Sequence, residues 1–173
     1  MNGTRVLILF VFGFLLGTAL IKCARAEEAT FYVFNGQSVS NSITDAHSLA
    51  WGLEQETPTR IGVWDFGYVN EGHKGQDKRD GIYAMYQFPY KFTPSLTTSF
   101  AIGPYFTATT ITDPDGVHYQ DHYSWAGLAA ASAEYSLTKH WRLQGRWAHV
   151  IYDQKNKDAD LFLIGVGYTP PEW

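Results

Sequence analysis

The stretch WRLQGRWAHVIY, residues 141–152, alternates along its length in a way that predicts a β-strand. One face carries mainly large apolar side chains, Trp141, Leu143, Trp147 and Ile151, together with Gly145 and His149. The other face begins with Arg142, Gln144 and Arg146 and ends with Ala148 and Val150. Because successive side chains of a strand point to opposite faces, one face of this strand is charged at its start and apolar at its end.

The same alternation recurs along the chain and predicts eight strands. They lie at about residues 31–39, 47–56, 60–70, 79–88, 96–110, 122–137, 140–152 and 160–168. The connections alternate between tight turns and long polar loops, of which the longest cover residues 70–81, 112–122 and 153–160. An even strand number, with short turns at one end and long loops at the other, is typical of bacterial outer-membrane barrels. We therefore predict an all-β fold, an eight-stranded antiparallel transmembrane β-barrel with its turns toward the periplasm.

The outward positions of the predicted strands form an apolar and aromatic band. They include Trp51, Trp64, Phe66, Phe88, Phe100, Ile102, Trp125, Trp147, Phe162 and Ile164, and aromatic residues make up 16% of the chain. Such a band suits acyl chains and headgroups, and it would be unfavourable in water. A soluble lipocalin-like barrel is the alternative, and this outward face argues against it.

The N-terminus has the features of a secretory signal peptide. Arg5 precedes an apolar run over residues 6–21, and Ala24-Arg25-Ala26 supplies a small-x-small cleavage site. We predict a signal peptide over residues 1–26 and a single barrel domain over 27–173, located in the outer membrane of a Gram-negative bacterium. That domain has no cysteine and carries 10 basic against 17 acidic residues, so we expect no disulfide chemistry and no nucleic-acid partner.

The predicted inward residues differ in character between the two ends of the barrel. Toward the short turns they are polar: Glu54, Asp65, Gln87, Ser99, Ser132, Glu134, Arg142, Gln144 and Arg146. Toward the long loops they are small or apolar, and the predicted lining of an acyl pocket is Gly67, Gly81, Tyr83, Ala126, Leu128, Ala148, Val150 and Leu161. Eight strands enclose a bore that side chains fill or that holds one slim ligand. We expect paired charges in a polar floor, and above it a hollow apolar slot that admits an acyl chain.

A charged floor under an acyl-sized apolar pocket, in a signal-bearing eight-stranded barrel, resembles the outer-membrane lipid A palmitoyltransferases. The resemblance implies transfer of an acyl chain from a phospholipid to lipid A, with a His, an Asp and a Ser acting on the extracellular side. No local motif aligns these three residues. By parity His122 and Ser124 face inward above Ala126, so we predict them as catalytic residues, with His73 and Asp80 opposite.

Two other functions stay open. Lipid A 3-O-deacylases are also eight-stranded outer-membrane barrels, with a lipid-facing His-x-Ser near the end of the strand before last, where this chain has His149-Val150-Ile151. Asp160 faces His149 across the last two strands, but Ile151 stands where the serine nucleophile is expected. The third possibility is a non-catalytic barrel that has a structural role or binds at the cell surface. We expect membrane lipids (lipid A and a phospholipid donor) as partners, a monomeric chain, and no metal or other cofactor, because the loop histidines show no metal-ligand spacing.

Overall fold

The computed structural model describes residues 29–41, 47–74, 77–112, 119–153 and 158–171. The predicted signal peptide, residues 1–26, lies outside the described residues. Eight strands are present: β1 (Thr30–Ser40), β2 (His47–Pro58), β3 (Val63–Lys74), β4 (Asp77–Lys91), β5 (Leu96–Thr112), β6 (Tyr119–Ser136), β7 (Trp141–Tyr152) and β8 (Ala159–Tyr168). Among the residues that the structure describes, no helix has the length and hydrophobicity to span a bilayer.

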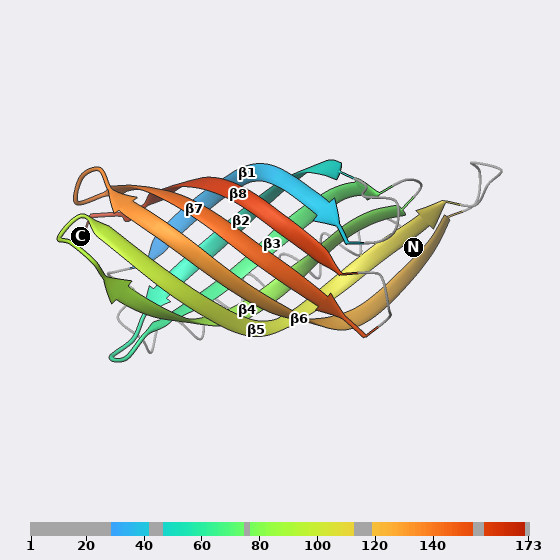
Figure 1. The fold of residues 1–173 in the computed structure, drawn as a ribbon, viewed down its shortest axis with the longest axis horizontal. Coiled ribbons are helices and arrows are strands. Elements are labelled where there is room, and N and C mark those ends of the chain that lie inside the picture. Colours follow the sequence, from blue (N-terminus) through green and yellow to red (C-terminus); the bar gives the residue numbers. More distant parts are fainter. Residues whose placement is uncertain (1–28, 42–46, 75–76, 113–118, 154–157, 172–173) are drawn as a thin grey trace.

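The strands form one closed antiparallel barrel in sequence order. Each strand pairs with its neighbours along the chain, and β1 pairs with β8 to close the sheet, for example at Phe34 and Gly165. Closure leaves no sheet edge with unpaired backbone groups, which is the condition for a β-structure to cross a bilayer. Figure 1 shows the strands inclined to the long axis, with the β5–β6 hairpin reaching farthest at the long-loop end. The predicted fold class is confirmed.

The strands extend farther at the long-loop end than the sequence predicted. The polar segment 70–81, expected as a loop, belongs largely to β3 and β4, and a register shift between Asn70 and Gly72 inserts Glu71 as an extra residue. Gly72 has a positive φ of 81°, a conformation that glycine adopts without steric cost. The Asn70 side chain accepts a hydrogen bond from the Gly72 backbone N–H at 2.9 Å. Glu71 points into the bore, like Val69 two residues earlier, and is fully buried, whereas the bulge shifts the alternation of the residues that follow it on β3.

The outward band is confirmed. The large apolar side chains predicted to face lipid are half-buried or exposed, with Leu49 77%, Trp125 68% and Ile164 66% exposed. Their inward neighbours on the same strands, such as Ala50, Leu163 and Leu161, are buried. The core of this molecule is therefore the interior of the barrel, and its apolar surface is the outside, as in barrels that lie in lipid.

Candidate functional site

The floor of the bore is an ionic network built around Arg146 of β7. Its two terminal nitrogens bond to the two carboxylate oxygens of Glu54 on β2, with Nη2 to Oε1 at 2.7 Å. The Tyr83 hydroxyl of β4 donates to Oε2 of the same Glu54 at 2.6 Å. The Arg146 and Glu54 side chains are 2% and 0% exposed. A two-pronged, hydrogen-bonded ion pair is the arrangement that compensates two buried charges.

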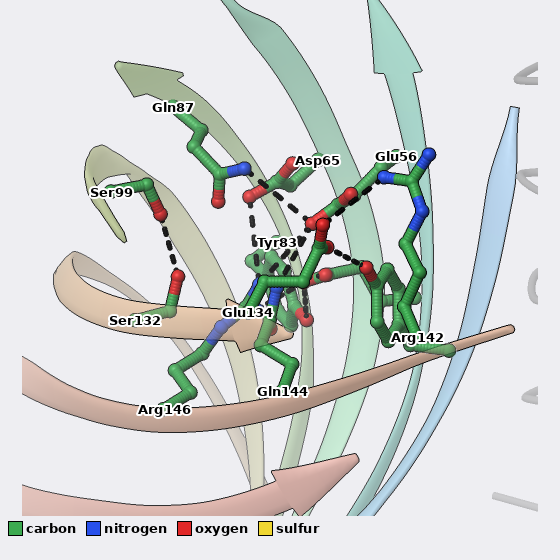
Figure 2. Close-up of polar contacts among 12 residues, drawn as sticks. Glu56, Asp65, Tyr83, Gln87, Ser99, Ser132, Glu134, Arg142, Gln144 and Arg146 are labelled. Atoms are coloured by element: carbon green, nitrogen blue, oxygen red, sulfur yellow. Dashed lines mark hydrogen bonds and ion pairs between the residues drawn. The ribbon is translucent and has the colours of Figure 1, made fainter. Parts of the chain in front are cut away.

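Two more carboxylates lie close to this pair. Glu56 Oε1 accepts from the side-chain amide of Gln144 at 3.2 Å and from that of Gln87 at 3.5 Å. Asp65 Oδ2 and Glu56 Oε1 lie 3.8 Å and 3.9 Å from Arg146 Nη2, within ion-pair range but beyond hydrogen-bond length. Figure 2 shows these side chains converging from β2, β3, β4 and β7.

A second ion pair lies beside the first. Arg142 Nη1 bonds to Glu134 Oε1 at 3.3 Å, and the Tyr32 hydroxyl donates to the other oxygen of Glu134. The hydroxyls of Ser99 and Ser132 bond to each other at 2.6 Å (Figure 2). The polar floor and the pairing of its charges, predicted from strand parity, are therefore confirmed.

The hollow apolar slot predicted above this floor is not present among the described residues. All eight predicted lining positions do face inward, but the space between them is occupied by large buried side chains: Tyr32, Phe34, Met85, Tyr105 and Glu71. A cavity of about 10 Å³ is lined by Phe34, Met85, Leu128, Ala148 and Leu161, among others. That is barely the space of one water molecule, so the bore as described holds no acyl chain.

The glycines explain why parity alone was misleading. A Cβ built on Gly67 would lie 2.4 Å from the ring of Tyr83, and one on Gly81 would lie 2.5 Å from the ring of Tyr105. Gly165 and Gly167 are covered in the same way by Phe34 and Tyr32. Gly67 and Gly81 were expected to leave a hollow, but each of them admits the ring of a neighbouring tyrosine.

Residues that the sequence analysis left out complete the upper bore. The Tyr105 and Tyr152 hydroxyls both donate to Glu71 Oε1, at 3.1 Å and 2.9 Å. The Arg79 guanidinium lies 5.1 Å from the centre of the Tyr152 ring. Glu71 and Arg79 lie within or at the edge of the segment expected as a loop, so continuing the strand alternation of β3 and β4 through that segment would have assigned both residues to the bore.

The four residues predicted as catalytic do not form one cluster. Asp80 faces outward on β4, where it accepts a hydrogen bond from the Tyr68 hydroxyl at 3.0 Å. His122 and Ser124 lie on β6, exposed at the long-loop end. Asp80 and Ser124 are separated by β5, opposite Ala108 and Thr107 respectively, and they belong to opposite faces of the sheet. His73, expected in a loop, is exposed on β3 and pairs in register with Lys78.

A different set of polar side chains does meet, on the outward face of β7 and β8. His149 and Asp160 are register partners, with 3.0 Å between Nδ1 and Oδ1. The Trp147 indole N–H donates to the same Oδ1 at 2.9 Å, and the Asn41 amide donates to Oδ2 at 2.8 Å. The His149 and Asp160 side chains are 28% and 21% exposed. The pairing of His149 with Asp160 was anticipated from parity, whereas Asn41 and Trp147 were not connected with it.

This arrangement leaves the imidazole positioned and partly accessible. Asp160 accepts three side-chain hydrogen bonds and is thereby held in one orientation. Among the described residues, Nε2 of His149 has no hydrogen-bond partner. An imidazole that a carboxylate orients through one nitrogen can use the other to take up a proton.

No family model and no curated protein matches this sequence. Solved structures do match it in fold. Neisserial surface protein A has a TM-score of 0.70 at 11% identity, over 82% of this chain and 97% of that one. The N-terminal β-barrel domain of Pseudomonas aeruginosa OprF has a TM-score of 0.59 at 12% identity, over 80% and 96%. Ail, the attachment invasion locus protein of Yersinia pestis, has a TM-score of 0.59 at 6% identity, over 82% and 98%.

At these identities the likeness concerns the fold alone. The matched structures cover most of this chain and nearly all of their own length, so the whole barrel is compared and not a part of it. Together with the closed topology and the outward apolar band, they identify the chain as an eight-stranded outer-membrane β-barrel.

Proposed function

We propose that this barrel hydrolyses an acyl ester of an outer-membrane lipid, with lipid A as the foremost substrate, at the lipid-facing pair His149 and Asp160. The observation that carries the proposal is the 3.0 Å contact between His149 Nδ1 and Asp160 Oδ1, on the side of the barrel where lipid lies. The proposal needs no acyl chain inside the bore. Acyl transfer from a bore-bound chain finds no support, because bulky side chains fill the bore.

The chemistry uses water as the nucleophile. His149 Nε2 takes a proton from a water molecule, whose oxygen attacks the ester carbonyl carbon to form a tetrahedral intermediate. The intermediate expels the sugar or glycerol oxygen, which receives that proton from the imidazolium, and a fatty acid and an alcohol leave. Asp160 holds Nδ1–H and stabilises the imidazolium.

The position of the pair supports access by an ester from the membrane. His149 lies between Trp147 and Ile151 on the outward face of β7, and these two side chains are 41% and 50% exposed. The pair lies toward the long-loop ends of its strands, where we expect the outer leaflet. The Trp147 ring stacks beside the His149 ring, with centroids 6.2 Å apart. Aromatic side chains of this kind are common at the headgroup level of membrane proteins.

The test is the mass of lipid A in a strain that lacks acyl-modifying outer-membrane enzymes. Expression of the wild-type chain is expected to remove one acyl group, and His149→Ala is expected to abolish the loss. His122→Ala is the matched control, because His122 is exposed on β6, away from the pair. A gain of one acyl group would instead indicate transfer, and loss that persists in His149→Ala would refute the assigned base.

A second candidate is a non-catalytic barrel that acts through its outer surface and loops. The observation in its favour is Ile151, which cannot act as a nucleophile at the position where a deacylase-like serine is expected. Unchanged lipid A and phospholipid masses, from a strain in which the folded barrel is detected in the outer membrane, would favour this candidate. In either case we propose that membrane lipids are its partners and that the chain acts as a monomer.

A further inference from the structure

We propose that the floor of the bore contains a site for one calcium ion, formed by Glu54, Glu56 and Asp65 with the side-chain oxygen of Gln144. The three carboxylates are buried, and one oxygen from each lies within 4.8 Å of the others. This site lies at the short-turn half of the bore, apart from the outward His149, and the proposal is independent of any hydrolysis there.

The balance of charge in the floor points to a missing cation. Among the described residues, Glu134 is paired with Arg142, whereas Glu54, Glu56 and Asp65 share the single guanidinium of Arg146. When all three carboxylates are ionised, two negative charges stay uncompensated in a buried site. Uncompensated buried charge is strongly unfavourable, and one divalent cation neutralises it.

Unpartnered oxygens provide independent support for a ligand. Both carboxylate oxygens of Asp65 are buried without a hydrogen-bond partner, and Asp65 is 0% exposed. Gln144 Oε1 is likewise buried and unpartnered, while the same amide donates through Nε2 to Glu56. Figure 2 shows Asp65 and Gln144 directed into the cluster. Buried oxygens of this kind need a donor or a cation.

Arg146 does not already occupy the open oxygens of Asp65 and Glu56. Its hydrogen bonds go to Glu54, and its Nη2 lies 3.8 Å from Asp65 Oδ2 and 3.9 Å from Glu56 Oε1. Glu54 is further engaged by the Tyr83 hydroxyl. The open ligand positions are therefore on Asp65, Glu56 and Gln144, with Glu54 at the edge of the site.

The ligand set and its dimensions favour calcium. Carboxylate and amide oxygens are ligands for hard cations, and Ca²⁺ binds them at about 2.3–2.6 Å in flexible geometry. Oxygens up to about 5 Å apart can therefore share one Ca²⁺, whereas about 4 Å is the limit for Mg²⁺, which also keeps several of its waters. The separation of up to 4.8 Å within this cluster matches the larger ion.

The proposal is tested on the full chain folded in a zwitterionic detergent, free of lipid and stripped with EDTA. Equilibrium dialysis with radioactive Ca²⁺ is expected to give one tight site per chain, and Mg²⁺ is expected to compete at least tenfold more weakly. Asp65→Asn removes a ligand charge with little change in size and should raise the Kd at least tenfold. Ser132→Ala, an uncharged change in the same floor and outside the cluster, should leave the Kd within twofold.

Three results would overturn the proposal. They are wild-type protein that retains no Ca²⁺, a site that Asp65→Asn leaves intact, and a site that prefers Mg²⁺. The second result would place the ion outside this cluster. If Asp65→Asn does not fold, Gln144→Leu serves instead. It removes a neutral ligand oxygen and should likewise raise the Kd. Charge compensation by protons alone would appear as the first result.

Discussion

The ring of Tyr83 covers Gly67, its register partner on β3, so closely that a Cβ added at Gly67 would lie 2.4 Å from Cζ of the ring. The same tyrosine hydroxyl donates to Glu54, which Arg146 holds from the other side. A single glycine therefore lets an aromatic ring fill the bore and lets its hydroxyl reach the ionic floor.

Gly67→Ala is expected to destabilise the barrel by about 1–3 kcal/mol, because the new methyl group displaces the Tyr83 ring. Unfolding in urea, followed by the shift of the folded band on unheated gels, measures the change. Gly145→Ala is the matched control: a Cβ there has nothing within 4 Å, so its effect should stay within about 0.5 kcal/mol. Equal effects of the two substitutions would contradict the role of the ring.

Arg146→Gln is expected to cost about 3–5 kcal/mol of unfolding free energy or to prevent folding, because it leaves Glu54 buried without its counter-ion. Arg142→Gln removes the partner of Glu134, but Arg142 is 31% exposed and water can replace it, so its cost should be clearly smaller. The same urea titration compares the two variants. A larger loss for Arg142→Gln would place the centre of the network elsewhere.

Strand parity predicted the barrel, the outward band and the ionic floor because each of them depends only on which face a residue occupies. The state of the upper bore depends on which ring covers which glycine, and that relation joins different strands. Residues 31–34 illustrate the difficulty: Phe31, Tyr32, Val33 and Phe34 are apolar or aromatic on both faces, so alternation did not show that Tyr32 and Phe34 point inward.

The same dependence on parity explains which parts of the candidate site were predicted. His149 and Asp160 were paired correctly because β7 and β8 alternate clearly up to these positions and the register of the two strands places them opposite each other. His73 was misplaced because the bulge at Glu71 shifts the parity of the residues beyond it on β3, and Asp80 was misplaced because its segment of β4 was expected to be a loop. A one-residue insertion of this kind leaves no composition signal other than Gly72, and glycine is also common in loops.

The outward face can be tested without reference to activity. Ile164 lies in the middle of β8 and is 66% exposed, so Ile164→Arg should place a charge in the hydrocarbon region at a cost of about 2–4 kcal/mol. Ile61 is 83% exposed in the turn between β2 and β3, where an arginine reaches water, so Ile61→Arg should have little effect. Folding efficiency into lipid vesicles measures both. A similar cost at the two positions would contradict the proposed placement in the bilayer.

Asp160→Asn tests how the lipid-facing pair works. The amide keeps the size of the carboxylate and can still bond to Asn41 or Trp147, but it no longer stabilises an imidazolium at His149. If the pair activates water, the rate of acyl release from purified lipid A should fall about 10²-fold or more, while stability changes little because Asp160 is partly exposed. Trp147→Phe removes one donor to Asp160 and leaves the His149 contact in place, so its rate should fall much less. Equal losses for Asp160→Asn and Trp147→Phe would indicate that the cluster maintains only the shape of this surface, since only the first substitution removes the charge opposite the base.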